Sequence, residues 1–297
     1  MTLQPCGART RACRIDTRVD ASLSIILFLF PSLAFAQTTK EVHFYSENLQ
    51  CFAKLFLPAN IGNSPAVVLA PGWGETESTI EKFAKAIAEK GIVAMAIDYR
   101  GWGKSGGYIY LAEDVRFDDR LRFSHHTAKV RIRRKRLIPD DQVDDIRNAI
   151  SYLQGEPGVD RARIGVFGKD MAAGHAMVVA GIDPRIKAVV AYLPVIEGND
   201  TPRKLPNEPT PARIKLARAD SAAATALSAE ENKIALSEYH PFWFVSQIPP
   251  SVAVLFVANQ NDQTNPTAAS KILKGPTEIK TNMSPTAAAE WFAKFLQ

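Results

Sequence analysis

The sequence predicts an α/β domain in which helices cover both faces of a mostly parallel β-sheet. Short apolar runs alternate along the chain with segments whose apolar residues recur at helical spacing, which is typical of βαβ units. The runs at 66–70 and 92–97 are apolar throughout, as in strands buried on both faces. Residues 164–176 have the pattern of an apolar strand, a tight turn and a helix of small residues.

The N-terminal half of the domain contains the first four predicted strands. Alternating residues between 38 and 57 predict two antiparallel strands joined near Glu47-Asn48. The strand at 66–70 stops at the loop Pro71-Gly-Trp-Gly74, and a helix follows over about 79–89. Gly91 ends that helix, and the strand at 92–97 leads into a glycine-rich loop over 98–107.

The C-terminal half continues the alternation of helices and strands. A helix starts at Pro139, and its apolar stripe consists of Val143, Ile146, Ile150 and Leu153. Strands follow at 164–167, 186–193, 252–258 and about 278–281, and a helix over 285–296 closes the chain. Two irregular blocks, 107–138 and 196–245, are expected to be cap-like insertions into a single domain over residues 37–297.

The first 36 residues have the pattern of a secretory signal peptide. They are basic, then apolar from Leu23 to Phe30, and they end in Ala34-Phe-Ala36, which predicts cleavage before Gln37. The apolar run is short and is followed by Pro31, so it is not expected to cross a bilayer as a stable helix. The prediction is a secreted or periplasmic protein, and a retained N-terminal anchor is the alternative.

The charge balance and the cysteines limit the choice of partners. The chain has 36 Lys and Arg against 31 Asp and Glu, a formal charge of +5 that falls to +3 without residues 1–36. So small an excess does not indicate a nucleic-acid partner. Two of the three cysteines lie in the leader, so Cys51 is expected to remain without an internal disulfide.

The densest charge run spans residues 129–136. The run is expected to be a solvated loop or an edge strand protected by its charges. Attraction to anionic lipid or to an acidic polymer is the alternative, and such binding should weaken as salt rises.

The tight turn at 168–173 has the layout of a nucleophile elbow, G-x-S-x-G, with Asp170 where serine is expected. Three further stretches, by their order and spacing, carry a family resemblance. They are Val67-Val-Leu-Ala-Pro-Gly-Trp-Gly74, Asp98-Tyr-Arg-Gly-Trp-Gly-Lys-Ser-Gly-Gly107, and the helix 143–153 followed by 159–165. Together they resemble the α/β-hydrolase superfamily, and within it the dienelactone-hydrolase-like and acetyl-xylan-esterase-like bacterial enzymes. The resemblance covers nearly the whole chain after the leader.

This resemblance implies an α/β-hydrolase fold and assigns positions to a catalytic site. Asp170 takes the nucleophile position, and the backbone N–H groups of Trp73 and Met171 take the oxyanion hole. Asp262 takes the position of the triad acid, and a surface aspartate capping a turn is the alternative for it. The family histidine belongs between the last strand and the terminal helix, but residues 277–285 contain none.

The substitution of aspartate for serine changes the chemistry that is expected. An aspartate that attacks an acyl group would form an anhydride, whereas a carboxylate can displace a leaving group at an alkyl carbon. Relatives resembling haloalkane dehalogenases and epoxide hydrolases work in this way, and they use a histidine to activate water. His240 is a speculative base, with packing in an aromatic cluster as its alternative. His175 is expected to be a buried structural residue.

Two functional hypotheses follow from the sequence. The first is a hydrolase of a small ester, lactone or alkyl substrate, with Trp102, Tyr108, Phe242 and Trp243 lining its pocket. Those aromatic residues could instead fix the insertions onto the core. The second is a catalytically silent homologue that serves as a binding or scaffolding module. No residue spacing suggests a metal site or a nucleotide cofactor, and the oligomeric state is left open.

Overall fold

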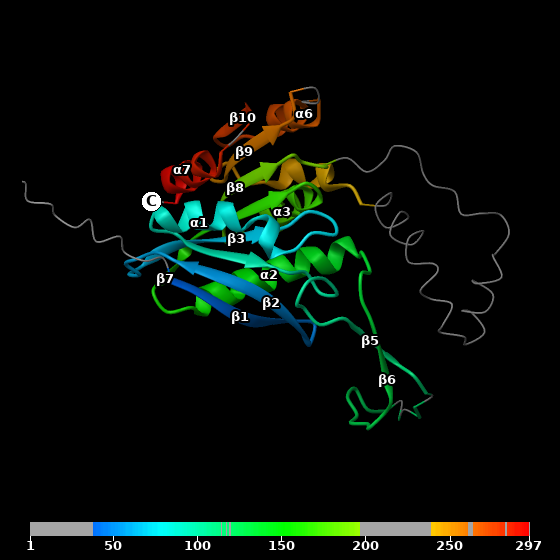
Figure 1. Cartoon of the computed structure of the whole chain (residues 1–297). Coiled ribbons are helices and arrows are strands. Elements are labelled where there is room, and N and C mark those ends of the chain that lie inside the picture. The colour runs from blue at the N-terminus through cyan, green and yellow to red at the C-terminus, as the bar shows by residue number, and fades with distance from the viewer. Residues whose placement is uncertain are drawn as a thin grey trace, which may run out of the picture. The chain divides into compact units, whose positions relative to one another are not determined.

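A computed structural model describes residues 38–113, 115, 116, 118, 120–196, 239–260, 264–282 and 284–296. Their main feature is an eight-stranded sheet in the order β1-β2-β4-β3-β7-β8-β9-β10 (Figure 1). The expected leader lies outside the described residues. The sheet, its helices and its connections agree with the predicted α/β-hydrolase fold.

Six of the eight strands are joined by parallel pairing, and the antiparallel pairing is confined to one edge. At that edge β1 (Thr38–Ser46) pairs with β2 (Leu49–Leu57), and β2 pairs antiparallel with β4 (Val93–Ile97). Glu47 and Asn48 both have positive φ, at 47° and 62°, which is the geometry of a two-residue hairpin turn. The predicted hairpin is therefore confirmed.

The remaining strands are parallel to β4. They are β3 (Ser64–Ala70), β7 (Val159–Lys169), β8 (Ile186–Tyr192), β9 (Ala253–Ala258) and β10 (Thr277–Thr281). Because the strands are parallel, their carboxyl ends and the loops that follow them meet at one edge of the sheet.

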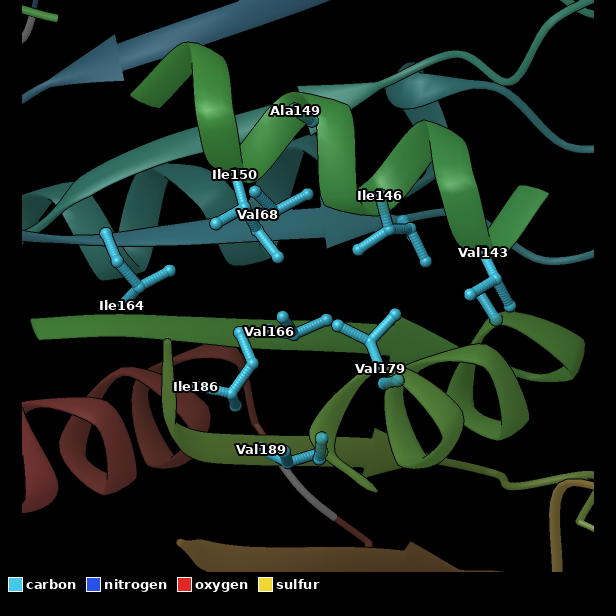
Figure 2. Close-up of a cluster of buried hydrophobic side chains, with 14 of the residues drawn as sticks. Val68, Val143, Ile146, Ala149, Ile150, Ile164, Val166, Val179, Ile186 and Val189 are labelled. Atoms are coloured by element: carbon cyan, nitrogen blue, oxygen red, sulfur yellow. The ribbon is translucent and has the colours of Figure 1, made fainter. Parts of the chain in front are cut away.

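Helices cover both faces of the sheet. The helices α2 (Pro139–Gly155) and α3 (Met171–Ile182) pack on one face, and α1 (Glu81–Glu89) and α7 (Pro285–Phe295) pack on the other. In β3, Val68 belongs to the first core and its neighbours Val67 and Leu69 to the second, so both faces of this strand are buried. Figure 2 shows Ile146 and Ile150 of α2 pointing toward Val68 and Val166 in the first core.

Several boundaries differ from the sequence prediction. The helix expected from residue 79 begins at Glu81, after a 3-10 turn, η1 (Glu77–Thr79). The strand expected at 164–167 is longer, because β7 begins at Val159 and continues through polar residues. The helix α6 (Thr264–Ile272) was not predicted, since its sequence has little apolar periodicity.

The two predicted insertions have different outcomes. The block 107–138, predicted as irregular, contains an antiparallel ribbon of β5 (Tyr108–Leu111) and β6 (Val130–Arg133). For residues 129–136 the structure thus has the edge strand, one of the two predicted alternatives. Most of the block 196–245 lies outside the described residues, and its C-terminal end forms the 3-10 helix η3 (Pro241–Gln247). No helix in the described ranges is long and apolar enough to span a membrane.

A buried ion pair holds the loop after β4 on α2. The Arg100 guanidinium donates to Asp145 over 2.7 Å, and the Arg100 backbone N–H donates to the other oxygen of the same carboxylate over 2.9 Å. Ser46 accepts a further bond from Arg100 over 2.6 Å. Since both charges are buried and hydrogen-bonded, the loop that carries Trp102 is held in place.

Candidate active site

The turn between β7 and α3 has the backbone strain of a nucleophile elbow. Asp170 has φ 55° and ψ −119°, a conformation that side-chain-bearing residues rarely adopt. Its N–H donates to Tyr192 O over 2.7 Å, and its C=O accepts from Ala173 N–H over 3.0 Å. These bonds hold Asp170 between the end of β8 and the first turn of α3.

Small residues allow the helix to approach the strand at this turn. A Cβ added to Gly168 would lie 2.0 Å from the carbonyl oxygen of Ala172, closer than any real Cβ contact. Glycine is therefore required at residue 168, as the elbow pattern predicts.

The Asp170 side chain does not cap α3, the helix that it precedes. An aspartate at a helix N-cap usually accepts a hydrogen bond from an N–H of the first turn, but Asp170 makes no such bond. In the described part of the chain, no side chain donates to its carboxylate either. The elbow thus presents a half-buried carboxylate with its acceptor oxygens available.

Glu75, in the loop after β3, lies beside Asp170. A Cβ built on Gly72 would be 3.0 Å from Glu75 Oε2 and 3.3 Å from Asp170 Oδ2, so the two carboxylates flank Gly72 closely. Glu75 accepts hydrogen bonds from Lys169 Nζ, from Gly72 N–H over 3.1 Å and from Thr79 Oγ1 over 3.1 Å. Lys169 and Glu75 thereby connect the elbow to the loop after β3.

The two carboxyl groups have pKa values shifted in opposite directions. Burial, and then the negative charge of Glu75, raise the pKa of Asp170, and Lys169 offsets only part of this effect. Burial also disfavours ionised Glu75, but the bonds from Lys169 and Gly72 outweigh it and lower its pKa. An ionised carboxylate therefore stands next to one that binds a proton more readily, an arrangement suited to acid–base chemistry.

The two backbone groups expected to form an oxyanion hole are available. Met171 is the first residue of α3, and Trp73 follows Gly72, which packs against Asp170. Neither N–H has an acceptor among the residues that the structure describes. The helix N-terminus adds a partial positive charge at Met171, which favours a developing anion.

One hollow lies on each side of β7 in the order of the sheet, on the loops that flank the elbow. One, of about 230 Å³, is lined by Leu193, Pro194 and Val195 after β8 and by residues after β9, and the Val195 N–H bonds to Asp170 O over 3.3 Å. The other, of about 360 Å³, is lined by Gly74, Trp102, Arg134, Lys135 and their neighbours. Both are large enough to admit small-molecule groups.

The expected pocket aromatics lie in separate places. Trp102 lines the larger hollow. Tyr108 is half-buried and donates its hydroxyl to Asp141 over 2.7 Å, near the base of the ribbon. Phe242 packs against the core from η3, whereas Trp243 is exposed on the same element. Neither residue of η3 lines the two hollows.

The predicted base and the predicted triad acid have different outcomes. His240 precedes η3, and its ring stacks on Trp243 with the centroids 4.7 Å apart. Asp262 lies outside the described residues.

His175 is buried in α3, as the sequence predicts. Its ring nitrogens bond to the Tyr239 hydroxyl over 2.6 Å and to Gln142 Oε1 over 3.0 Å. Burial lowers the pKa of His175 to about 3, so it remains neutral near neutral pH. Cys51 is buried and unpaired, and burial raises the pKa of its thiol, so it is unreactive.

Two residues of the candidate site, Glu75 and Lys169, were not predicted from the sequence. Lys169 occupies the variable position of the elbow, and Glu75 directly follows the loop Pro71-Gly-Trp-Gly74. Their pairing depends on the parallel alignment of β3 and β7, which brings together residues that are 94 positions apart in the chain. In the described residues, no group of three His, Cys, Asp or Glu side chains is placed to hold a metal ion.

Comparisons with known proteins agree with the α/β-hydrolase fold. The model of the dienelactone hydrolase family matches residues 51–275. A thiohydrolase of Arthrinium phaeospermum, apmlB, is 30% identical over 140 residues, which are 47% of this chain and 38% of the relative. The quorum-quenching protein AidA of Acinetobacter baumannii is 25% identical over 163 residues, 54% of this chain and 46% of the relative. The matched stretches thus span less than half of these curated relatives.

A solved structure extends the similarity of the fold over most of the chain. The hypothetical protein PA2218 of Pseudomonas aeruginosa superposes with a TM-score of 0.65 at 17% identity, and the match covers 88% of this chain and 94% of that one. At this identity, the match supports the fold alone.

Proposed function

Because the chain belongs to the dienelactone hydrolase family of α/β hydrolases, we propose that it hydrolyses small thioesters or esters with Asp170 as the catalytic carboxylate. The observation that carries this proposal is the strained, uncapped Asp170 at the elbow. Backbone strain at a residue that does not stabilise its own helix is typical of a functional position. Family membership gives the class of reaction, and the site suggests how the reaction proceeds.

The chemistry that fits the site is general-base hydrolysis. Asp170 takes a proton from a water whose oxygen attacks the acyl carbon, and the carbonyl electron pair moves onto the carbonyl oxygen. The N–H groups of Trp73 and Met171 stabilise that oxyanion. When the carbon–sulfur or carbon–oxygen bond breaks, the leaving thiolate or alkoxide takes the proton from Asp170. Aspartate is regenerated, and no histidine is required.

Three features favour an acyl substrate over an alkyl substrate. Oxyanion donors assist attack at a carbonyl, whereas displacement at an alkyl carbon develops no oxyanion there. The raised pKa of Asp170 makes it a stronger base than an ordinary aspartate. Two relatives carry the name thiohydrolase, and a thiolate leaves with less help from an acid than an alkoxide does.

The test is a substrate panel with the purified chain. Aryl and alkyl thioesters, the matching oxygen esters, a lactone, an epoxide and a haloalkane would be supplied in ¹⁸O-labelled water. We expect turnover of the acyl substrates, fastest with thioesters, and ¹⁸O in the product acid but not in Asp170.

Three results would contradict this mechanism. Label in the Asp170 carboxylate would indicate covalent attack by Asp170, as would turnover of the epoxide or haloalkane. Ligand-dependent thermal stabilisation without turnover of any substrate would instead support a silent binding module.

We also propose that residues 1–36 are a leader that directs export of the chain. The basic, apolar and A-x-A segments of the sequence support this. Expression of the full chain in a Gram-negative host should yield a periplasmic protein whose N-terminus is Gln37. An intact N-terminus on a membrane-associated protein would instead indicate a retained anchor.

A further inference from the structure

The paired strands β5 and β6 lie outside the eight-stranded sheet (Figure 1). The block 107–138 that contains them is here called the basic ribbon. Its base is attached to the domain by the bond from Lys135 N–H to Gly101 O, 3.0 Å, and by the bond between Tyr108 and Asp141. Among the residues that the structure describes, β5 pairs only with β6. A two-stranded ribbon of this kind gains little stability from its own pairing.

One face of the basic ribbon is aliphatic and exposed. Residues directly opposite each other in an antiparallel pair point to the same face, and the pairs Ile109 with Ile132 and Leu111 with Val130 share one face. All four side chains are between 48% and 64% exposed. In the segment between the strands, Leu121 and Phe123 are also exposed, the latter at 83%. A cluster of exposed large apolar side chains indicates an interaction surface.

The basic ribbon also holds the positive charge excess of the chain. Residues 107–138 contain nine Lys and Arg and four Asp and Glu, a formal charge of +5 that equals the charge of the whole chain. The rest of the sequence is balanced. On the face opposite the aliphatic one, Arg133 pairs with Tyr108 and Arg131 with Tyr110, so cationic and aromatic residues alternate there.

We propose that the basic ribbon docks the protein on an anionic lipid surface. Lipid headgroups would attract the Lys and Arg side chains, and the aliphatic face would enter the boundary between headgroups and acyl chains. Insertion is shallow, because the unpaired edges of β5 and β6 must keep water or headgroup partners. The proposal does not depend on the chemistry of Asp170.

Other partners explain only part of these observations. An acidic polymer would account for the charge but would leave the four aliphatic side chains in water. A second copy of the chain could cover the aliphatic face, but two basic ribbons would repel each other. A lipid surface with anionic headgroups satisfies both features at once.

The test is co-sedimentation of the chain with vesicles of phosphatidylcholine alone or of phosphatidylcholine mixed with phosphatidylglycerol. We expect binding to the mixed vesicles only, with a loss of binding as salt increases. The variant Ile109→Ser/Ile132→Ser should weaken that binding about tenfold or more, and Lys129→Gln/Lys135→Gln should do the same.

Matched variants outside the basic ribbon provide the control. Ile182→Ser/Ile272→Ser changes two other exposed isoleucines, and Lys187→Gln/Lys271→Gln changes two other lysines. Both should bind mixed vesicles like the wild type, and thermal melting of each variant checks that it is folded.

Four results would overturn the proposal. The first is an absence of binding to either vesicle, and the second is equal loss of binding in the ribbon and control variants. The third is binding to heparin but not to vesicles, with the isoleucine variant binding heparin as the wild type does. This result would identify an acidic polymer as the partner. Dimerisation that Ile109→Ser/Ile132→Ser abolishes would assign the aliphatic face to a second copy instead.

Discussion

The elbow and the basic ribbon both depart from the usual distribution of side chains, but in opposite directions. At the elbow, an ionisable residue is half-buried without a hydrogen-bond donor, on a strained backbone held by β8 and α3. In the basic ribbon, four aliphatic side chains are between 48% and 64% exposed on strands that, among the described residues, pair only with each other. Strain at the elbow needs a rigid surrounding core, whereas the ribbon contributes little to stability. The difference suggests that the core supports chemistry and the ribbon supports contacts.

The largest expected difference between the two regions is in stability. Ile150 is fully buried between α2 and the sheet, and Ile132 is 64% exposed in the basic ribbon. Ile150→Ala should lower the free energy of unfolding by about 2–5 kcal/mol. Ile132→Ala should change it by less than about 0.5 kcal/mol. Urea denaturation of both variants measures this, and similar losses would show that the ribbon is packed against the domain.

A smaller effect tests whether the elbow is held by close packing. Gly168→Ala places a Cβ against the Ala172 carbonyl and should destabilise the protein by about 1–3 kcal/mol. Gly155→Ala is the matched control, because its Cβ would meet no atom within 4 Å. Equal melting temperatures for the two variants would contradict the close approach of α3 to β7.

The third effect is a shift in pH dependence. Glu75→Gln removes the negative charge that raises the pKa of Asp170, so the pKa of Asp170 should fall. Since the base must be ionised to act, the acid-side limb of kcat/KM against pH should move to lower pH. A limb that stays in place, with the variant folded, would show that Glu75 does not act on the catalytic group.

The smallest effect is the loss of folding stability caused by the ionised Asp170 carboxylate at the elbow. The folded-state pKa of Asp170 lies above its ordinary value of 3.8, so its ionised form destabilises the folded state at neutral pH. Asp170→Asn should therefore raise the melting temperature slightly near neutral pH. This gain should shrink as the pH falls through the folded pKa toward and below 3.8. A loss of stability in this variant near neutral pH would contradict the raised pKa.

The sequence predicted the core elements better than the ribbon, for a physical reason. Continuous apolar runs specify buried parallel strands, and Gly168 with Ala172 and Ala173 specifies the elbow, because burial and close packing restrict the residue types. In the ribbon, the alternating Arg and Ile residues do not pack into a hydrophobic core. An edge strand was therefore only one of two alternatives for residues 129–136, and the rest of the block was predicted as irregular.

The site was predicted in part for a related reason. Asp170 and Met171 follow from the elbow pattern, and Trp73 follows from the resemblance of residues 67–74 to a strand and oxyanion loop; each pattern is local in sequence. Glu75 and Lys169 meet only through the adjacent placement of β3 and β7, so no local pattern identifies them. The role of Asp262 stays a prediction, because that residue lies outside the described residues. The participation of His240 also stays a prediction.

The central claim is that the Asp170 carboxylate performs the chemistry. The most direct test compares kcat/KM for a thioester between the wild type, Asp170→Asn and the matched surface variant Asp144→Asn. The account predicts a loss of about 10²–10⁴-fold for Asp170→Asn and wild-type activity for Asp144→Asn. Thioester hydrolysis by Asp170→Asn at the wild-type rate would contradict the account.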